Sequence, residues 1–259
     1  MMFLTAQPLW LSGILVGLLT LLAMTGPVLV RRRLGLERLR TNNEVAGFKF
    51  ATVGVLYAVL LAFAVVVVWQ KFDDADNAVA QEAGAAETIY RLSNGIGDTP
   101  GAMLRDGMTA YLKSVINQDW PAMERGKASP VVTRALDRVY ASLLVHSPND
   151  FRGADAVTEI LRQLDVMTTA RRERLVMAAG VVPGIVWLVL FGGAVVTIGF
   201  TFFFGTENIR AQSAMTGALS LLIFSGLLII IAIDHPFTGS VSVDPDPIAA
   251  VLRDFGAAR

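Results

Sequence analysis

One stretch decides the fold: residues 42–92 read NNEVAGFKFATVGVLYAVLLAFAVVVVWQKFDDADNAVAQEAGAAETIYRL. Its middle part, Ala51 to Trp69, contains no ionisable side chain and has about the length that a helix needs to cross the roughly 30 Å hydrocarbon core of a bilayer. After Trp69, apolar residues recur at steps of three and four as far as Tyr90, and no proline interrupts them. We therefore predict one long helix that crosses the membrane and continues into water.

The composition of the whole chain is that of a membrane protein. Of its 259 residues, 54% are hydrophobic and 17% are charged, which leaves few charges to cover a soluble surface. The formal net charge is zero, so no basic excess indicates a nucleic-acid partner. Cysteine is absent from the sequence, which excludes disulfides, thiolate catalysis and cysteine-bound metals.

Three more apolar runs are long enough to cross a bilayer: Pro8 to Val30, Leu175 to Phe204, and Ala211 to Ile233. The first is predicted to be an uncleaved anchor, because its positive charges follow the apolar run, whereas those of a signal peptide precede it. Pro183-Gly184 divides the second of these runs, so we place its crossing after Gly184. The short polar segment from Gly205 to Arg210 predicts a tight hairpin between the last two spans.

The predicted fold is therefore all-α, with four transmembrane helices and a helical extramembrane domain formed by extensions of the second and third spans. Four parts follow along the chain: a first transmembrane pair (1–70), the helical domain (71–174), a second transmembrane pair (175–233) and a tail with a short helix (234–259). Prolines that follow capping residues predict the helices outside the membrane. These are Lys71–Asn94, Pro100–Gln118, Pro130–His146, a helix from Asp150 onward and a last one from Asp246 to Arg253. We expect Ser240–Val243 to be extended and Phe237 to pack back on the helical domain.

The loop at residues 31–50 sets the predicted topology. It carries six basic residues against two acidic ones, and such loops remain in the cytoplasm. We therefore expect a multi-pass protein of the bacterial inner membrane whose N-terminus and helical domain are extracytoplasmic. The opposite orientation stays open, because basic residues also lie near the membrane ends of the long segment: Lys71, Arg162, Arg171, Arg172 and Arg174.

No pattern in the sequence indicates an enzyme, a bound metal or a cofactor. Its two histidines, His146 and His235, have no partner at ligand spacing, and the serines of the last span have no nearby base. Gly192-Gly193 lies inside an apolar span, where it suits close helix approach better than phosphate binding. The spans also lack an ionisable residue at depth, which argues against proton relays, voltage sensing and ion-coupled transport.

Two features of the long helix are candidates for function. Small residues follow one another at steps of three and four, and they predict either a helix contact, which we favour, or a pore wall: Gly47, Ala51, Gly54, Ala58 and Ala62. Acidic residues then follow the span, and Asp73, Asp74 and Asp76 would form a charged vestibule in an oligomer or simply a solvated helix face. Glu82 falls toward the apolar face, so we predict a buried charge pair with Arg171 or Arg174.

Several short segments occur together in this chain: Val68-Trp69, Phe72, Ala75, Val79, Glu82-Ala83, Ile89-Tyr90-Arg91-Leu92, Tyr111, Asp119-Trp120-Pro121, Arg171 with Arg174, and Asp234-His235-Pro236-Phe237-Thr238-Gly239. As a set they resemble the bestrophin-like domain family of bacterial membrane proteins, over almost the whole chain beyond the first span. The family name implies distant similarity to bestrophins, which are pentameric anion channels with four membrane helices per subunit.

The resemblance implies a homo-oligomer in the lipid bilayer that passes inorganic ions through a pore lined by the second span. The acidic segment at the end of that span departs from true bestrophins and predicts a preference for cations. The alternative is a non-conducting membrane scaffold or sensor whose helical domain binds a partner. A symmetric pore with the second helix innermost would favour the channel, and a monomer with a solid bundle would favour the scaffold.

Overall fold

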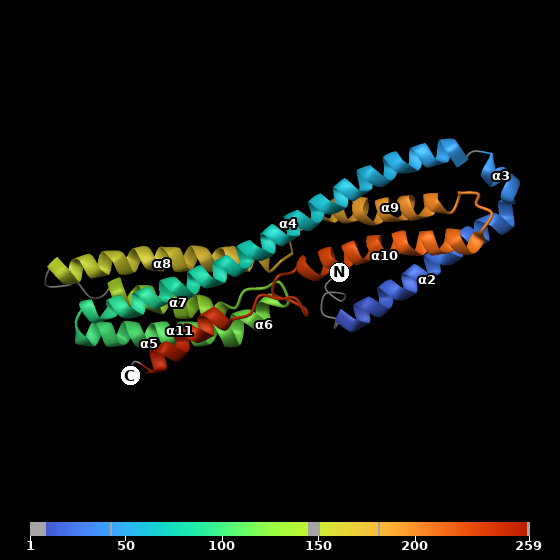
Figure 1. Cartoon of the computed structure of the whole chain (residues 1–259). Coiled ribbons are helices and arrows are strands. Elements are labelled where there is room, and N and C mark those ends of the chain that lie inside the picture. The colour runs from blue at the N-terminus through green and yellow to red at the C-terminus, as the bar shows by residue number, and fades with distance from the viewer. Residues whose placement is uncertain (1–8, 42, 145–150, 181, 258–259) are drawn as a thin grey trace. The chain divides into compact units, whose positions relative to one another are not determined.

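The computed structural model describes residues 9–41, 43–144, 151–180 and 182–257 (Figure 1). Every regular element in these ranges is a helix, and four of the helices are long and apolar enough to cross a membrane. The all-α prediction with four spans is therefore confirmed. The chain divides into two compact units, a membrane unit of residues 1–70 and 181–234 and a helical unit of residues 71–180 and 235–259.

The predicted long helix is present as α4 (Asn43–Leu92), 50 residues without interruption. Its first part belongs to the membrane unit and the remainder to the helical unit. The third span, in contrast, is not continuous with the helix that precedes it. The helix that precedes it, α8 (Phe151–Met177), ends before Ala178, and α9 begins at Gly184, directly after Pro183. Gly180, with a φ of 86°, lies just past the end of α8, and Pro183 occupies the N-cap position of α9.

The membrane unit contains α2 (Leu9–Leu34), the short α3 (Leu36–Arg40), the first part of α4, α9 (Gly184–Thr201) and α10 (Ile209–Ile233). Helices α2 and α10 pack along one another, and Gly217 of α10 accommodates the side chain of Met24. Most large apolar side chains that the chain leaves exposed lie on these spans, as expected for surfaces that meet lipid or other subunits.

The loop after α2 and the loop between α9 and α10 meet at one end of the membrane unit. Asn43 binds Gly205 twice: its Nδ2 donates to the Gly205 carbonyl at 2.8 Å, and its Oδ1 accepts from the Gly205 amide at 2.9 Å. Arg31 donates to the carbonyl of Thr206 at 3.1 Å, and Arg40 forms an ion pair with Glu207. Four crossings place both loops on the same side of a membrane, and these contacts agree with that arrangement.

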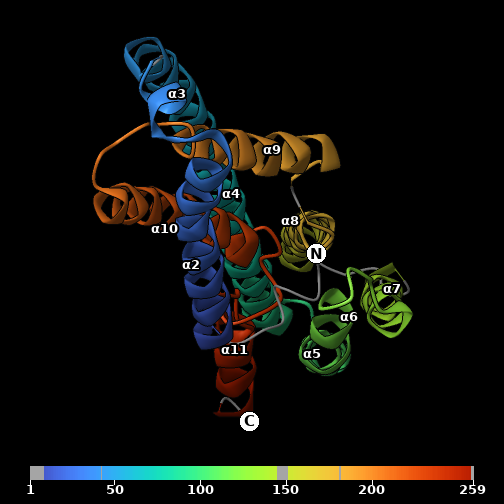
Figure 2. The same cartoon turned by 90° about the vertical axis from the view of Figure 1, so that its right-hand side faces the viewer.

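The helical unit packs the second part of α4 with α5 (Asp98–Ser114), α7 (Pro130–Leu144), α8 and α11 (Asp246–Ala257) around one apolar core. A 3₁₀ turn, Ser93–Gly95, follows α4, and a π turn, Val115–Asp119, joins α5 to α6 (Trp120–Met123). Helices α5 and α7 lie side by side in both views (Figures 1 and 2). His146 and Asp150, which were expected to end one helix and begin the next, lie outside the described residues.

Two details of the helical unit bear on the expectations from sequence. Phe237 is buried and meets Trp120 edge-on with ring centroids 5.8 Å apart, so the tail packs back as predicted. Helix α5 begins at Asp98, two residues before the proline at Pro100. The preceding Gly97 has a φ of 95°, which lets the chain turn into the helix at this earlier point.

Candidate functional site

One face of α4 packs on the other helices of the membrane unit. The hydroxyl of Tyr57 donates to the carbonyl of Leu190 at 3.1 Å, and its ring lies against Gly193, where a Cβ would come within 2.5 Å of it. Phe50 meets Phe204 edge-on at 5.6 Å. Gly193 thus permits the close approach expected of the glycine pair in α9, whereas a Cβ at Gly192 would meet nothing within 4 Å.

The small-residue stripe occupies a different flank of α4. Ala51, Ala58 and Ala62 are exposed, and a Cβ at Gly47 or Gly54 would meet no atom within 4 Å. No described helix of the chain covers this stripe. Both interpretations of it, a helix contact and a pore wall, therefore involve a second copy of the chain or another molecule.

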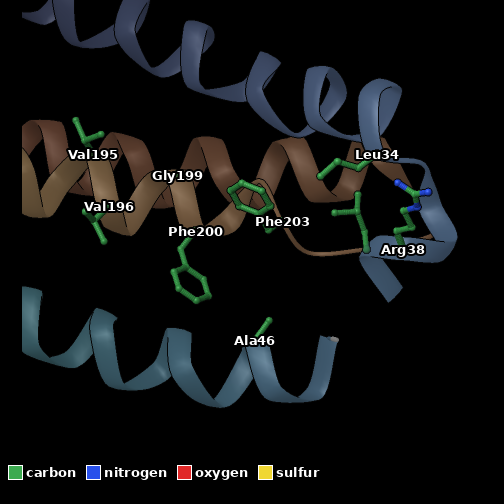
Figure 3. Close-up of a pocket in the computed structure, with 9 residues that line it drawn as sticks. Leu34, Arg38, Ala46, Val195, Val196, Gly199, Phe200 and Phe203 are labelled. Atoms are coloured by element: carbon green, nitrogen blue, oxygen red, sulfur yellow. The ribbon is translucent and has the colours of Figure 1, made fainter. Parts of the chain in front are cut away.

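A hollow of about 590 Å³ lies in the membrane unit near the loop end of the spans (Figure 3). Its wall comes from α9, from the end of α2 and from the start of α4, and Arg38 of α3 contributes the charged part of the lining. Phe200 points from α9 toward α4, on which Ala46 lies opposite (Figure 3). All other lining residues are apolar or glycine: Leu34, Leu39, Val195, Val196, Gly199 and Phe203.

The three aspartates after the second span are exposed but do not share one face. With about 100° of rotation per residue, Asp73 and Asp76 lie about 60° apart, whereas Asp74 lies about 100° from Asp73 and 160° from Asp76. Asp74 also forms an ion pair with Lys71, at 3.0 Å between Oδ2 and Nζ, and Asn77 donates to Asp73 at 3.4 Å. Asp73 and Asp76 are therefore the pair that presents negative charge on a common side.

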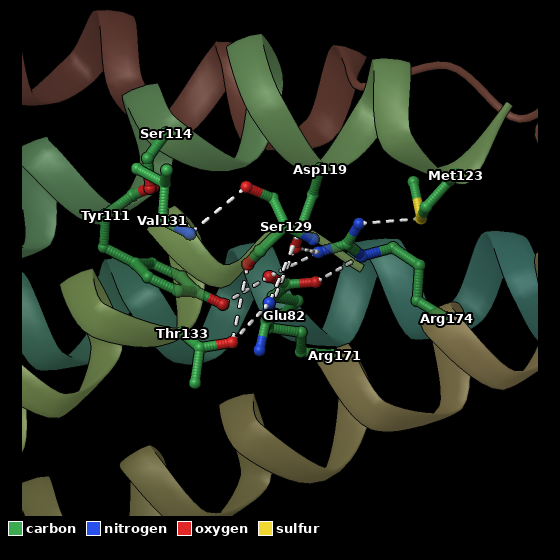
Figure 4. A network of polar contacts seen from close by, with 10 residues as sticks. All are labelled: Glu82, Tyr111, Ser114, Asp119, Met123, Ser129, Val131, Thr133, Arg171 and Arg174. Atoms are coloured by element: carbon green, nitrogen blue, oxygen red, sulfur yellow. Dashed lines mark hydrogen bonds and ion pairs between the residues drawn. The ribbon is translucent and has the colours of Figure 1, made fainter. Parts of the chain in front are cut away.

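Glu82 and Arg174 meet inside the helical unit, and both side chains are fully buried (Figure 4). Nε of Arg174 donates to Oε2 of Glu82 at 2.7 Å, and a second guanidinium nitrogen donates to Oε1 at 3.1 Å. The hydroxyl of Tyr111 donates to the same Oε1 at 2.6 Å. Each carboxylate oxygen therefore has a donor, and the three side chains join α4, α5 and α8.

Arg171, the other predicted partner of Glu82, pairs with Asp119 instead. Its Nε donates to Oδ2 of Asp119 at 2.9 Å, and Arg174 reaches the same oxygen at 3.4 Å. The backbone amide of Ser129 donates to Oδ1 of Asp119 at 2.9 Å, which ties the segment before α7 to the same carboxylate. The result is one connected network of two acids and two arginines.

The charges of this network balance, which makes its burial possible. Burial raises the pKa of Tyr111 well above its usual value, and the negative charge of Glu82 raises it further, so Tyr111 is a neutral donor. Burial alone would lower the pKa of Arg174, but the Glu82 carboxylate more than offsets this and the pKa is raised. The Arg174 guanidinium also lies 4.9 Å from the ring centre of Trp120. We interpret the network as a structural clamp.

Asp119 and Tyr111 were not predicted as members of this network. The available signal was the pair Arg171 and Arg174, which lie on one face of α8 and require two buried acids, of which only Glu82 was identified. Among the described residues, no group of three or more histidine, aspartate or glutamate side chains is placed to hold a metal ion. The described arrangement provides helix contacts and paired charges.

Comparison with known proteins identifies similar chains. The family model of the Bestrophin-like domain matches residues 17–248. A crystal structure of a bacterial bestrophin homologue from Klebsiella pneumoniae superimposes with a TM-score of 0.68 at 16% identity, covering 93% of this chain and 96% of that one. A single-residue variant of that homologue gives a TM-score of 0.69 at 16% identity, with 94% and 97% covered. A variant of a protein described only as a membrane protein gives 0.70 at 14% identity, with 93% and 97% covered. No curated protein matches the chain significantly.

Proposed function

Because this chain belongs to the Bestrophin-like family, we propose that it is the subunit of a homo-oligomeric ion channel in which the first part of α4 surrounds the pore. The family match and the fold that the chain shares with bestrophin homologues support a candidate ion channel.

The observation that carries the proposal is the uncovered stripe of α4. Tyr57 turns the adjacent flank toward α9, whereas a Cβ at Gly54 would meet no atom within 4 Å and Ala51, Ala58 and Ala62 are exposed. In a membrane, small residues let helix backbones approach closely, and that contact is here open to another copy of the chain. A ring of such copies would place the α4 helices around a common axis, and the stripe would then form the helix contact or the pore wall.

The acidic residues that follow the second span bear on which ions the proposed pore would prefer. Asp73 follows Ala62 by eleven residues, which is about three turns, so the two positions lie on the same side of a regular helix. Repeated around an oligomer, Asp73 and Asp76 would form acidic rings near the pore mouth. Such rings concentrate cations, so we propose a preference for cations over anions.

The topology completes the proposal. The arginine-rich loop that contacts the α9–α10 loop would lie in the cytoplasm, and the helical unit would lie on the outer side of a bacterial inner membrane. The absence of an ionisable residue deep in the described spans is compatible with passive conduction.

The test is the reversal potential of purified oligomer in planar bilayers under a salt gradient. We expect cation selectivity in the wild type and a shift toward anions in the double variant Asp73→Asn with Asp76→Asn. Asp74→Asn is the matched control, because Asp74 faces another side and is already paired with Lys71. If the double variant conducts with an unchanged reversal potential, the vestibule is refuted. If well-folded oligomer repeatedly carries no current, the non-conducting scaffold replaces the channel.

A further inference from the structure

The hollow in the membrane unit combines an apolar wall with a cation at its rim. Val196, Gly199 and Phe200 of α9 face it from one side and Ala46 of α4 from another, while Arg38 lies at its α3 end (Figure 3). Its volume of about 590 Å³ is within the range of ligand sites, which are mostly apolar with a few polar groups that orient the ligand. A ligand with a long apolar part and an anionic end would match both parts of this lining.

Arg38 is the arginine of this region that lines the hollow, and its charge is available. Arg31 donates to the carbonyls of the α9–α10 loop, and Arg40 is paired with Glu207. Arg38 is exposed and has neither an ion pair nor a side-chain hydrogen bond within the described part of the chain. A guanidinium group in this state is a ready donor to a phosphate.

The position of the hollow matches this chemistry. It lies where α2 ends and α4 begins, so Arg38 is close to the loop end of two spans and the wall of α9 continues into the apolar part. The loop end of a span is the level at which hydrocarbon gives way to headgroups. Basic sites between membrane helices at this level bind the headgroups of anionic lipids.

We propose that this hollow binds a phospholipid with an anionic headgroup, with its phosphate on Arg38 and an acyl chain along Val195, Val196 and Phe200. The proposed lipid site is separate from the stripe of α4. The proposal therefore does not depend on whether the protein conducts ions. A soluble phosphate would use only Arg38 and would leave the apolar wall without a partner, so the two ends of the hollow together select a lipid.

The test measures lipid bound to the full-length protein after delipidation and re-addition of phosphatidylglycerol or phosphatidylcholine, by native mass spectrometry. We expect phosphatidylglycerol to bind in a fixed ratio to the subunit and more tightly than phosphatidylcholine. Arg38→Gln should weaken phosphatidylglycerol binding about fivefold, the effect of one cation at a membrane surface. The matched control Arg33→Gln, in the same loop but outside the lining, should leave it unchanged.

The variant Ala46→Leu tests the apolar end, because it fills the hollow and should weaken binding of both lipids. Val45→Leu is its control, since Val45 is exposed and does not line the hollow. Equal binding by Arg38→Gln and Arg33→Gln would overturn the proposal, as would displacement of the lipid by inorganic phosphate alone. If Ala46→Leu breaks the oligomer while lipid binding persists, the hollow is a subunit contact and the proposal fails.

Discussion

Replacing Arg174 with methionine would leave the Glu82 carboxylate buried without its cation. Among the described residues, Oε2 of Glu82 accepts only from Arg174, at 2.7 Å, while Oε1 also accepts from the hydroxyl of Tyr111. Methionine fills much of the vacated volume, so the loss is mainly electrostatic. Removing one partner of a buried ion pair costs about 3–5 kcal/mol, and we expect the free energy of unfolding to fall by about that amount.

The double variant Glu82→Leu with Arg174→Met shows whether the cost comes from the orphaned charge. It removes both charges and leaves the Asp119–Arg171 pair, at 2.9 Å, in place. What remains is the unpartnered hydroxyl of Tyr111, which costs about 1–3 kcal/mol. The double variant should therefore lose less stability than the two single variants added together, by an interaction energy of at least about 3 kcal/mol.

Unfolding can be followed locally, because Trp120 lies 4.9 Å from the Arg174 guanidinium and reports on this network. The measurement is denaturant unfolding in detergent, observed by the fluorescence of Trp120 after the other three tryptophans are replaced by phenylalanine. Arg162→Met is the matched control: it lies on the same helix and breaks an exposed pair with Glu159, so we expect little change. A loss for Arg174→Met no larger than for Arg162→Met, or an additive double variant, would show that water reaches Glu82 and refute the reasoning.

Three further predictions follow from the described contacts. Gly54→Leu should weaken the free energy of subunit association in detergent by about 1–3 kcal/mol. It should not unfold the chain, because a Cβ at this position meets nothing within 4 Å. Leu56→Ala should leave association unchanged, and equal effects of the two variants would refute the stripe as the contact. Single cysteines at Thr99 and Thr41, both exposed, should be labelled by a membrane-impermeant thiol reagent on intact cells at Thr99 only, and the reverse pattern would invert the topology. Because the pKa of Tyr111 is raised, its contribution to stability is complete below the unfolded pKa near pH 10 and is lost as the pH rises toward the folded value. Tyr111→Phe should flatten the fall in stability above pH 10, and an unchanged slope would contradict this.

The membrane helices could be predicted from sequence because the bilayer imposes a simple rule. An apolar run of sufficient length without ionisable side chains must form its backbone hydrogen bonds internally, and this identified α4 and the break at Pro183. The start of α5 was placed two residues late, since Thr99-Pro100 resembles a helix start but the left-handed turn at Gly97 comes first. Local patterns thus indicate where helices lie and leave their ends uncertain by a turn.

The ion network could be predicted only in part, for a geometric reason. Helix periodicity placed Glu82 on the apolar face, but Arg171 and Arg174 are three residues apart and share a face of α8, so periodicity could not choose between them. Which arginine binds Glu82 depends on Asp119, because Asp119 forms an ion pair with Arg171. Asp119 ends a π turn, Val115–Asp119, and a single wider turn leaves no repeating pattern from which its direction could be deduced.

The two flanks of α4 show why periodicity cannot supply the function. Both flanks carry positions suited to close helix contact, and on one of them Tyr57 lies against Gly193. The other presents Gly54 and Ala58 to no described helix of the chain. A periodic pattern identifies a face but not what covers it, because the partner lies elsewhere in the sequence or in another molecule. Since the described contacts of this span with α9 and α10 lie on the first flank, the second is the surface on which assembly, and with it conduction, must be tested.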